Sequence, residues 1–123
     1  MTLQRLVGVA ASSAEESTMK KRVGAALVLR NKRVFAGHNK QKTHPKSLSP
    51  WSLHAEVSVI IQCAALAMKD LHGATLCVVR LTKSGLFAMS FPCKDCLDVI
   101  RHNGISRVVF TGPDRLVYEA KGI

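Results

Sequence analysis

The sequence predicts an α/β layered domain, because segments rich in apolar and β-branched residues alternate with segments of helical periodicity. The chain of 123 residues fits one small domain, residues 1–123, and its 47% hydrophobic content is enough for a core. No apolar run is long enough to cross a bilayer, and we interpret the short run "LVGVAAS" as a helix face rather than a signal peptide. We therefore expect a cytoplasmic protein with no membrane partner.

The first third of the chain predicts one helix followed by two strands. Apolar residues recur at helical spacing between residues 3 and 14. The apolar segment "RVGAALVLR" (22–30) predicts a strand, "NK" predicts a tight turn, and "RVFAGH" (33–38) predicts a returning strand. The polar stretch "NKQKTHPKSLSP" (39–50) predicts a loop, and its length suggests a functional one.

The rest of the chain predicts two helices and four strands. Residues 52–70 carry apolar positions on one helical face, with Ser52 as the candidate cap. Residues 93–103 predict a second helix, with Pro92 in its first turn and "NG" at its end. The predicted strands are 74–81, a short one at 86–90, 106–111 and 116–121.

The positive charge is concentrated in the first half of the chain. Lys and Arg total 18 against 8 Asp and Glu, which gives a net charge of +10. Residues 1–52 hold ten basic and two acidic residues, so they account for +8 of that charge. Such a half favours an anionic partner, namely a phosphate, a nucleotide or a nucleic acid. A solvated basic surface explains the same charge equally well.

Cys93, Cys96 and His54 form a candidate metal site. Cysteines at i and i+3 lie about 60° apart around a helix, so their sulfurs can meet one metal ion. Together with His54 they supply ligand types that zinc prefers, and three protein ligands with an open fourth position are typical of a catalytic zinc. Cys63 and Cys77 lie in apolar segments, where buried packing is the expected role.

Glu56, two residues after His54, favours a hydrolytic site over a structural one. A hydrolytic zinc needs a carboxylate that takes the proton from water, whereas a structural zinc has no use for it. Residues two apart on a regular helix point about 200° apart. The two side chains can therefore converge only at the very tip of the helix.

The motifs "HAE" and "PCKDC" resemble the signature H-x-E…P-C-x-x-C of the zinc-dependent cytidine and deoxycytidylate deaminase superfamily. "VGAALVLRNKRVFAGHN" resembles that family's first hairpin and G-x-N turn, and "GISRVVFT" resembles the strand after its cysteine helix. The resemblance covers roughly residues 3–112. It implies a three-layer α/β/α fold around a mixed sheet of about five strands.

The resemblance also implies a reaction. Zinc held by His54, Cys93 and Cys96 activates a water molecule, and Glu56 passes protons from that water to the base and to the departing ammonia. In deoxycytidylate deaminases an Asn often lies two residues after the glutamate, where this chain has Ser58. That difference affects the choice of substrate rather than the chemistry.

Five residues are candidate substrate contacts. The resemblance implies that Asn39 contacts the sugar or base and that the backbone N–H of Ala55 bonds the base. Lys40 lies between these motifs, where a phosphate contact and a solvated loop are equally expected. Trp51, beside a loop proline, is the better candidate for a pocket wall, whereas Phe91 suits stacking on the base or core packing.

Three functions remain open at this point. The leading one converts a cytosine-type base to uracil in a free nucleotide or nucleoside. The second is the same chemistry on cytosine, or less readily adenine, in single-stranded DNA or RNA, which the basic first half favours and the scarcity of aromatic residues disfavours. The third is a non-catalytic zinc-bound interaction domain with His38 or His44 as a fourth ligand. Family members commonly self-associate, so a homo-oligomer is expected.

Overall fold

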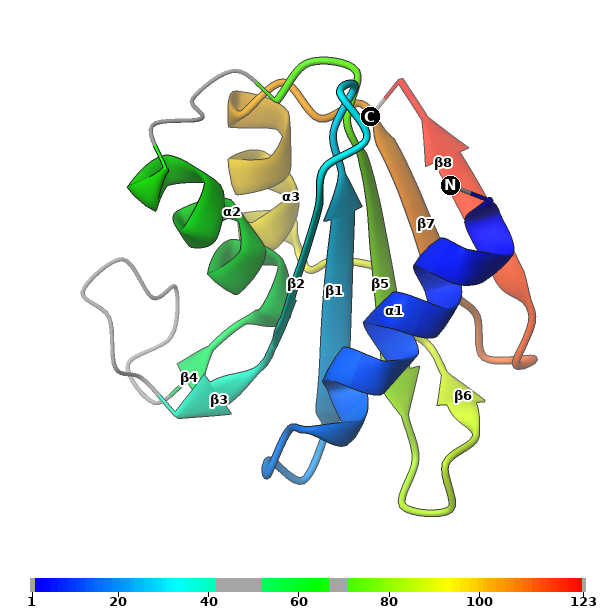
Figure 1. Cartoon of the computed structure of the whole chain (residues 1–123). Helices are drawn as coiled ribbons and strands as arrows, with labels where there is room; N and C mark the ends of the chain where they lie inside the picture. Colours follow the sequence, from blue (N-terminus) through cyan, green and yellow to red (C-terminus); the bar gives the residue numbers. More distant parts are fainter. Residues whose placement is uncertain (1, 42–51, 67–70, 123) are drawn as a thin grey trace.

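A mixed six-stranded sheet lies at the centre of the molecule, with helix α1 on one face and helices α2 and α3 on the other (Figure 1). The computed structural model describes residues 2–41, 52–66 and 71–122. The predicted three-layer α/β/α fold is confirmed. The elements are α1 (Leu3–Glu15), β1 (Arg22–Val28), β2 (Val34–His38), β3 (Lys40–Gln41), β4 (Ser52–Leu53), α2 (Ala55–Ala65), β5 (Thr75–Leu81), β6 (Phe87–Ala88), α3 (Lys94–His102), β7 (Arg107–Thr111) and β8 (Val117–Lys121).

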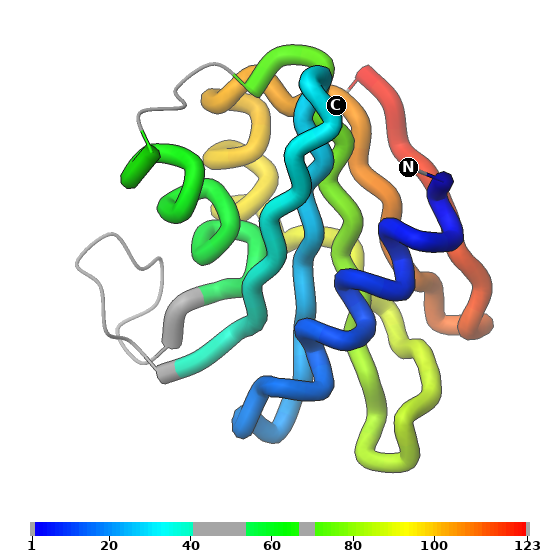
Figure 2. The backbone as a smooth tube through the Cα atoms, viewed as in Figure 1, coloured from blue at the N-terminus to red at the C-terminus, as the bar shows by residue number. Residues whose placement is uncertain are grey.

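The strands follow the order β2-β1-β5-β7-β8, and β6 pairs with the end of β5. β1 runs antiparallel to both β2 and β5, and β8 runs antiparallel to β7. The pair β5–β7 is parallel, so the chain must cross from one end of the sheet to the other between them. Helix α3 makes this crossover and is thereby held on the same face as α2, as the backbone trace shows (Figure 2).

Each face of the sheet has its own hydrophobic core. On the first face, Leu6, Ala10 and Ala14 of α1 pack against the sheet. On the other face, side chains of α2 and α3 pack against Leu27, Leu76 and neighbouring residues. Cys77 lies in the first core and Cys63 in the second, both fully buried, as their apolar surroundings in the sequence predict. The described helices have 13, 11 and 9 residues, and none is long and apolar enough to span a membrane.

The start of α2 differs from the prediction. Ser52 was expected to cap a helix over 52–70, but Ser52 lies in β4, which pairs with β3, and His54 is the N-cap. The backbone of His54 is still extended, at φ −71° and ψ 149°, so helical geometry begins only at Ala55. The described part of the helix ends at Ala65, and residues 67–70 lie outside the described ranges.

Two other boundaries shift for local reasons. The strand predicted over 22–30 ends at Val28, because the backbone of Leu29 already closes the turn by bonding Arg33 and Lys32. Pro92 precedes the N-cap Cys93 and therefore lies before α3 rather than in its first turn. The "NG" stop is confirmed, since Gly104 follows the C-cap with a φ of +85°, a conformation that glycine adopts without strain.

Gly24 sets the distance between α1 and the sheet, and its replacement by Ala should destabilise the protein. A Cβ at this position would lie 2.0 Å from the Ala10 carbonyl oxygen and 2.4 Å from the Ala14 nitrogen, both in the backbone of α1. The helix would have to move away from a core that it fills. We expect Gly24→Ala to lower the free energy of unfolding by about 3 kcal/mol, measured by urea denaturation.

Gly8, in the same helix, provides the matched control. A Cβ there meets no atom within 4 Å, so Gly8→Ala should raise the free energy of unfolding by about 0.5–1 kcal/mol through helix propensity alone. Equal stabilities of the two variants would contradict this account of the α1 contact.

Candidate active site

His54 is positioned by the junction between β4 and α2. Its extended backbone at the N-cap turns the imidazole away from the helix axis, and the ring makes no capping hydrogen bond. Instead, His54 Nδ1 lies 3.0 Å from Cys96 Sγ. The side chain of this N-cap residue therefore contacts the neighbouring helix α3 and does not cap α2.

The start of α3 brings both cysteines to the same place. Cys93 is the N-cap, with an extended backbone at φ −66° and ψ 168°, and its sulfur accepts the backbone N–H of Cys96 at 3.5 Å. Cys93 Sγ lies 4.0 Å from His54 Nδ1, and the three ligand atoms lie within 4.8 Å of one another. Cys96 is buried and Cys93 is exposed, so the cluster has a closed side and an open side.

Glu56 lies in the first turn of α2 beside this cluster. Only 5% of the residue is exposed, and burial raises the pKa of its carboxyl. Its own backbone N–H, the nearby His54 and a hydrogen bond with Cys96 oppose that rise. Because His54 is an extended N-cap, the two side chains need not follow helical spacing. His54 and Glu56 therefore converge at the tip of α2, as the sequence predicts for a hydrolytic site.

A cavity of about 540 Å³ opens over the cluster, which is within the usual size for a small-molecule site. Most of its wall comes from the segment before β1, the start of α2, and the segment between β6 and α3, and single residues of β1, of β5 and of the chain after β2 complete it. The lining residues are Met19, Lys20, Lys21, Val23, Asn39, His54, Ala55, Glu56, Arg80, Met89, Ser90, Phe91 and Cys93.

Ser90 fixes the segment that leads into Cys93. Its hydroxyl donates to the Val78 carbonyl at 2.7 Å and accepts the backbone N–H of Thr111 at 2.7 Å, while its own N–H donates to the Thr111 carbonyl at 2.8 Å. Ser90 is 7% exposed, so these bonds are shielded from water. One side chain thus ties β5, β7 and the approach to α3 together.

Asn39 similarly fixes the segment between α1 and β1. Its Oδ1 accepts the Ser17 hydroxyl at 2.7 Å and the Val23 N–H at 2.9 Å, and its Nδ2 donates to the Lys21 carbonyl at 2.6 Å. The second N–H of this amide bonds to none of the described residues. One N–H of the Asn39 amide therefore has no partner among the described residues, and the rest of the amide supports the cavity wall.

Most of the residues expected at the site share this cavity. His54, Cys93 and Glu56 form its floor, and Cys96 lies buried directly beneath it, in contact with His54. Asn39, Ala55 and Phe91 also line the cavity. The Ala55 N–H belongs to the first turn of α2, where backbone donors have no partner within the helix. Phe91 is 39% exposed and meets the ring of Phe110 edge to face at 4.9 Å.

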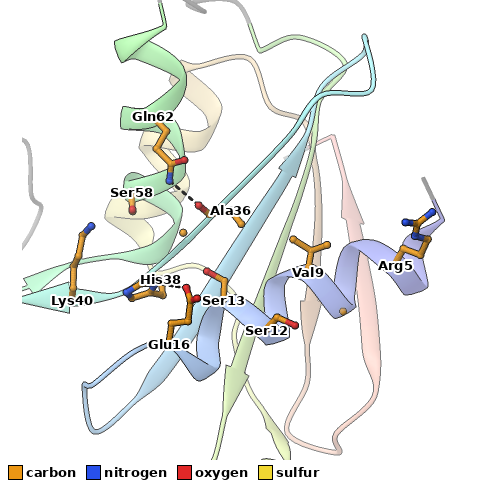
Figure 3. Close-up of a pocket in the computed structure, with 12 residues that line it drawn as sticks. Arg5, Val9, Ser12, Ser13, Glu16, Ala36, His38, Lys40, Ser58 and Gln62 are labelled. Carbon is orange, nitrogen blue, oxygen red and sulfur yellow. Dashed lines mark hydrogen bonds and ion pairs between the residues drawn. The ribbon is translucent and has the colours of Figure 1, made fainter.

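One expected contact, Lys40, is not found there, and another cannot be placed. Lys40 lines a different cavity, of about 650 Å³, between α1, β2 and α2 (Figure 3). Trp51 lies outside the described residues. The structure adds Lys20, Lys21 and Arg80 to the site, and no motif in the sequence points to these residues. The only sequence signal for the lysines was their place in the cationic run "KKR" directly before a predicted strand.

A fourth protein ligand is not found in the described part of the chain, where the cluster of candidate metal ligands is limited to His54, Cys93 and Cys96. His38 faces away, with its Nδ1 3.7 Å from Glu16 Oε2 on the wall of the second cavity (Figure 3). His44 lies outside the described residues. The described geometry is thus that of a three-ligand site with an open side.

Known structures share this fold. A cytidine deaminase from Burkholderia pseudomallei superposes with a TM-score of 0.77 at 24% identity, covering 99% of this chain and 94% of that one. The dCMP deaminase of cyanophage S-TIM5 gives 0.65 at 20% identity, over 91% and 86%. A structure from a study of A-to-I editing by tRNA:A34 deaminases gives 0.55 at 30% identity, over 89% and 69%.

The sequence itself matches a family model. A search of curated proteins found no match. Residues 1–112, however, match the model described as the cytidine and deoxycytidylate deaminase zinc-binding region. These residues include the three clustered ligands, the buried Glu56, and Asn39 and Ser90, which fix two segments of the cavity wall. The chain therefore belongs to the cytidine and deoxycytidylate deaminase zinc-binding family.

Proposed function

We propose that this protein is a hydrolytic deaminase that converts a cytosine-type base to uracil in a free nucleotide or nucleoside. The observation that carries the proposal is the position of Glu56, a buried carboxyl beside three clustered metal ligands on the floor of one cavity. A structural metal site has no use for such a group, whereas a hydrolytic site needs it.

The donor set fits a zinc ion. Two ligands of a tetrahedral zinc, at roughly 2.0 Å for nitrogen and 2.3 Å for sulfur, are separated by about 3.6 Å. The separations of His54 Nδ1 from the two sulfurs, 3.0 and 4.0 Å, bracket this value. A zinc ion bound there supplies the Lewis acidity that makes water nucleophilic at neutral pH. Cys93 is exposed and lines the cavity, so a zinc ion held by these three residues would be accessible to water and substrate from that side.

The residues of the chain account for the proton movements. Hydrolysis replaces the exocyclic amine at C4 with oxygen, so cytosine and water become uracil and ammonia. Glu56 accepts one proton from the attacking water and delivers it to the ring nitrogen N3. It then transfers the second proton to the amine, which leaves as ammonia. The raised pKa of Glu56 suits a group that both takes and returns protons.

The remaining wall groups orient the base. Ala55 and Asn39 both line the cavity, and the Ala55 N–H and the second amide N–H of Asn39 suit a ligand with acceptor atoms, as the cytosine edge and the sugar provide. Phe91, exposed at the cavity, offers an aromatic surface for stacking.

A second candidate function is deamination within a polynucleotide. The net charge of +10 and the 30% identity to a structure from the tRNA deaminase study favour it. The salt dependence of substrate binding distinguishes the two candidate functions. Binding to a polynucleotide strand weakens steeply with added salt, whereas binding of a mononucleotide weakens much less.

Replacing Glu56 tests the proposed chemistry. Glu56→Gln keeps the size of the side chain but cannot accept the proton, so turnover of the best substrate among cytidine, deoxycytidine and their monophosphates should fall about 1,000-fold. Ammonia release measures turnover, and elemental analysis measures retained zinc. Glu15→Gln, an exposed position at the end of α1, should leave both unchanged. Full activity of Glu56→Gln would refute the assigned role.

Thiol reactivity tests the metal ligands separately from activity. Burial raises the pKa of Cys77 to about 12 and also raises that of Cys63, so both should resist iodoacetamide at about pH 8 while the protein is folded. Cys93 is exposed and should be protected only by bound zinc. Peptide mass spectrometry should therefore show Cys93 alkylated first after chelation. Equal labelling of Cys93 with and without zinc would contradict its role as a ligand.

A further inference from the structure

The charges around the active-site cavity are unevenly distributed. Lys20, Lys21 and Arg80 line it, and the acid among the lining residues is Glu56, which is buried beside the metal ligands. None of the three cations forms an ion pair with a described residue, although such pairs occur elsewhere in the molecule, as between Arg107 and Glu119. Their charges are therefore available to a ligand in the cavity.

The position of the two lysines is set by buried hydrogen bonds. Ser17 is 6% exposed, and its hydroxyl bonds Asn39 and accepts the N–H of Met19 at 3.2 Å. Asn39 in turn bonds the Lys21 carbonyl and the Val23 N–H. The segment that carries Lys20 and Lys21 is thus anchored at both ends. A merely solvated basic stretch would not require this anchoring.

Arg80 approaches the cavity from a different element. It belongs to β5, is half-buried, and its backbone is fixed by the strand pairs on both sides of β5. The neighbouring Arg22 uses its guanidinium on the Thr82 carbonyl, at 2.5 Å, and does not line the cavity. Cations from two separate elements therefore share one cavity with the buried carboxyl.

We propose that Lys20, Lys21 and Arg80 form a phosphate subsite, and that the substrate is a free nucleoside monophosphate rather than the nucleoside. This inference rests on the proposed deamination. A phosphate monoester carries close to two negative charges at neutral pH, which the three positive charges of two lysines and one arginine can fully neutralise. Arginine can bind two phosphate oxygens at once, while each lysine acts as a point charge. A cavity of about 540 Å³ accommodates a base, a sugar and a phosphate.

The first test compares substrates. The zinc-loaded protein should deaminate the monophosphate of cytidine or deoxycytidine with a kcat/KM about 100-fold above that of the nucleoside. Lys20→Gln/Lys21→Gln, and separately Arg80→Gln, should each lower this ratio by about 10-fold or more. Arg5→Gln/Lys83→Gln removes two exposed charges outside this cavity and should leave the ratio unchanged. Equal ratios in all four proteins would overturn the subsite.

The second test does not depend on turnover. Calorimetry should show uridine monophosphate binding more tightly than uridine, and the difference should shrink in the Lys20→Gln/Lys21→Gln variant but not in the control. If this difference appears while no cytosine substrate is deaminated, the phosphate subsite stands and the proposed reaction fails. If an oligonucleotide binds through the same cations more tightly than the monophosphate, the assignment to a free nucleotide is wrong.

Discussion

The convergence of two helix N-termini is the constraint on which this structure depends. His54 and Cys93 are both N-caps with extended backbones. The His54 ring makes no capping bond and contacts the cysteines of α3, whereas Cys93 Sγ accepts the Cys96 N–H of its own helix and also lies 4.0 Å from His54 Nδ1. The positive ends of both helix dipoles point at the same place, where they favour thiolates and other anions. The helices can meet in this way only if they lie on one face of the sheet, and the parallel pair β5–β7 places α3 there.

The opposite face of the sheet contributes to the site through its connections. Helix α1 packs closely over Gly24, and the chain leaving it passes Ser17 before entering β1. Asn39 ties that passage to the end of β2, so the wall that carries Lys20 and Lys21 is coupled to the packing of α1. On the other wall, Ser90 fixes the segment before α3 through its hydrogen bonds to β5 and β7. The cavity is thus held by both layers of the core.

The sequence predicted the elements and the metal ligands because both are local patterns. Helical periodicity, β-branched runs and the paired motifs each lie within a few neighbouring residues. The prediction of Ser52 as the cap was wrong, because serine is a common cap residue whereas the N-cap here is His54. The His54 ring contacts Cys96, which is 42 residues away in the sequence, and no local pattern predicts such a contact. Arg80 could not be predicted as a wall residue, since only the pairing of the strands places it beside the α2 tip.

The adjacent residues Asn39 and Lys40 line two different cavities. Successive side chains of an extended chain point to opposite sides, so Asn39 and Lys40 cannot both face the active site. Asn39 faces it, and Lys40 lines the cavity beside Glu16 and His38. A cationic residue that is close to a motif in the sequence therefore need not lie close to the active site in the structure. The cations that do line the active-site cavity come from the segment before β1 and from β5, whereas the metal ligands stand at the starts of α2 and α3. The proposed phosphate subsite and the proposed position of the base are therefore built from different elements.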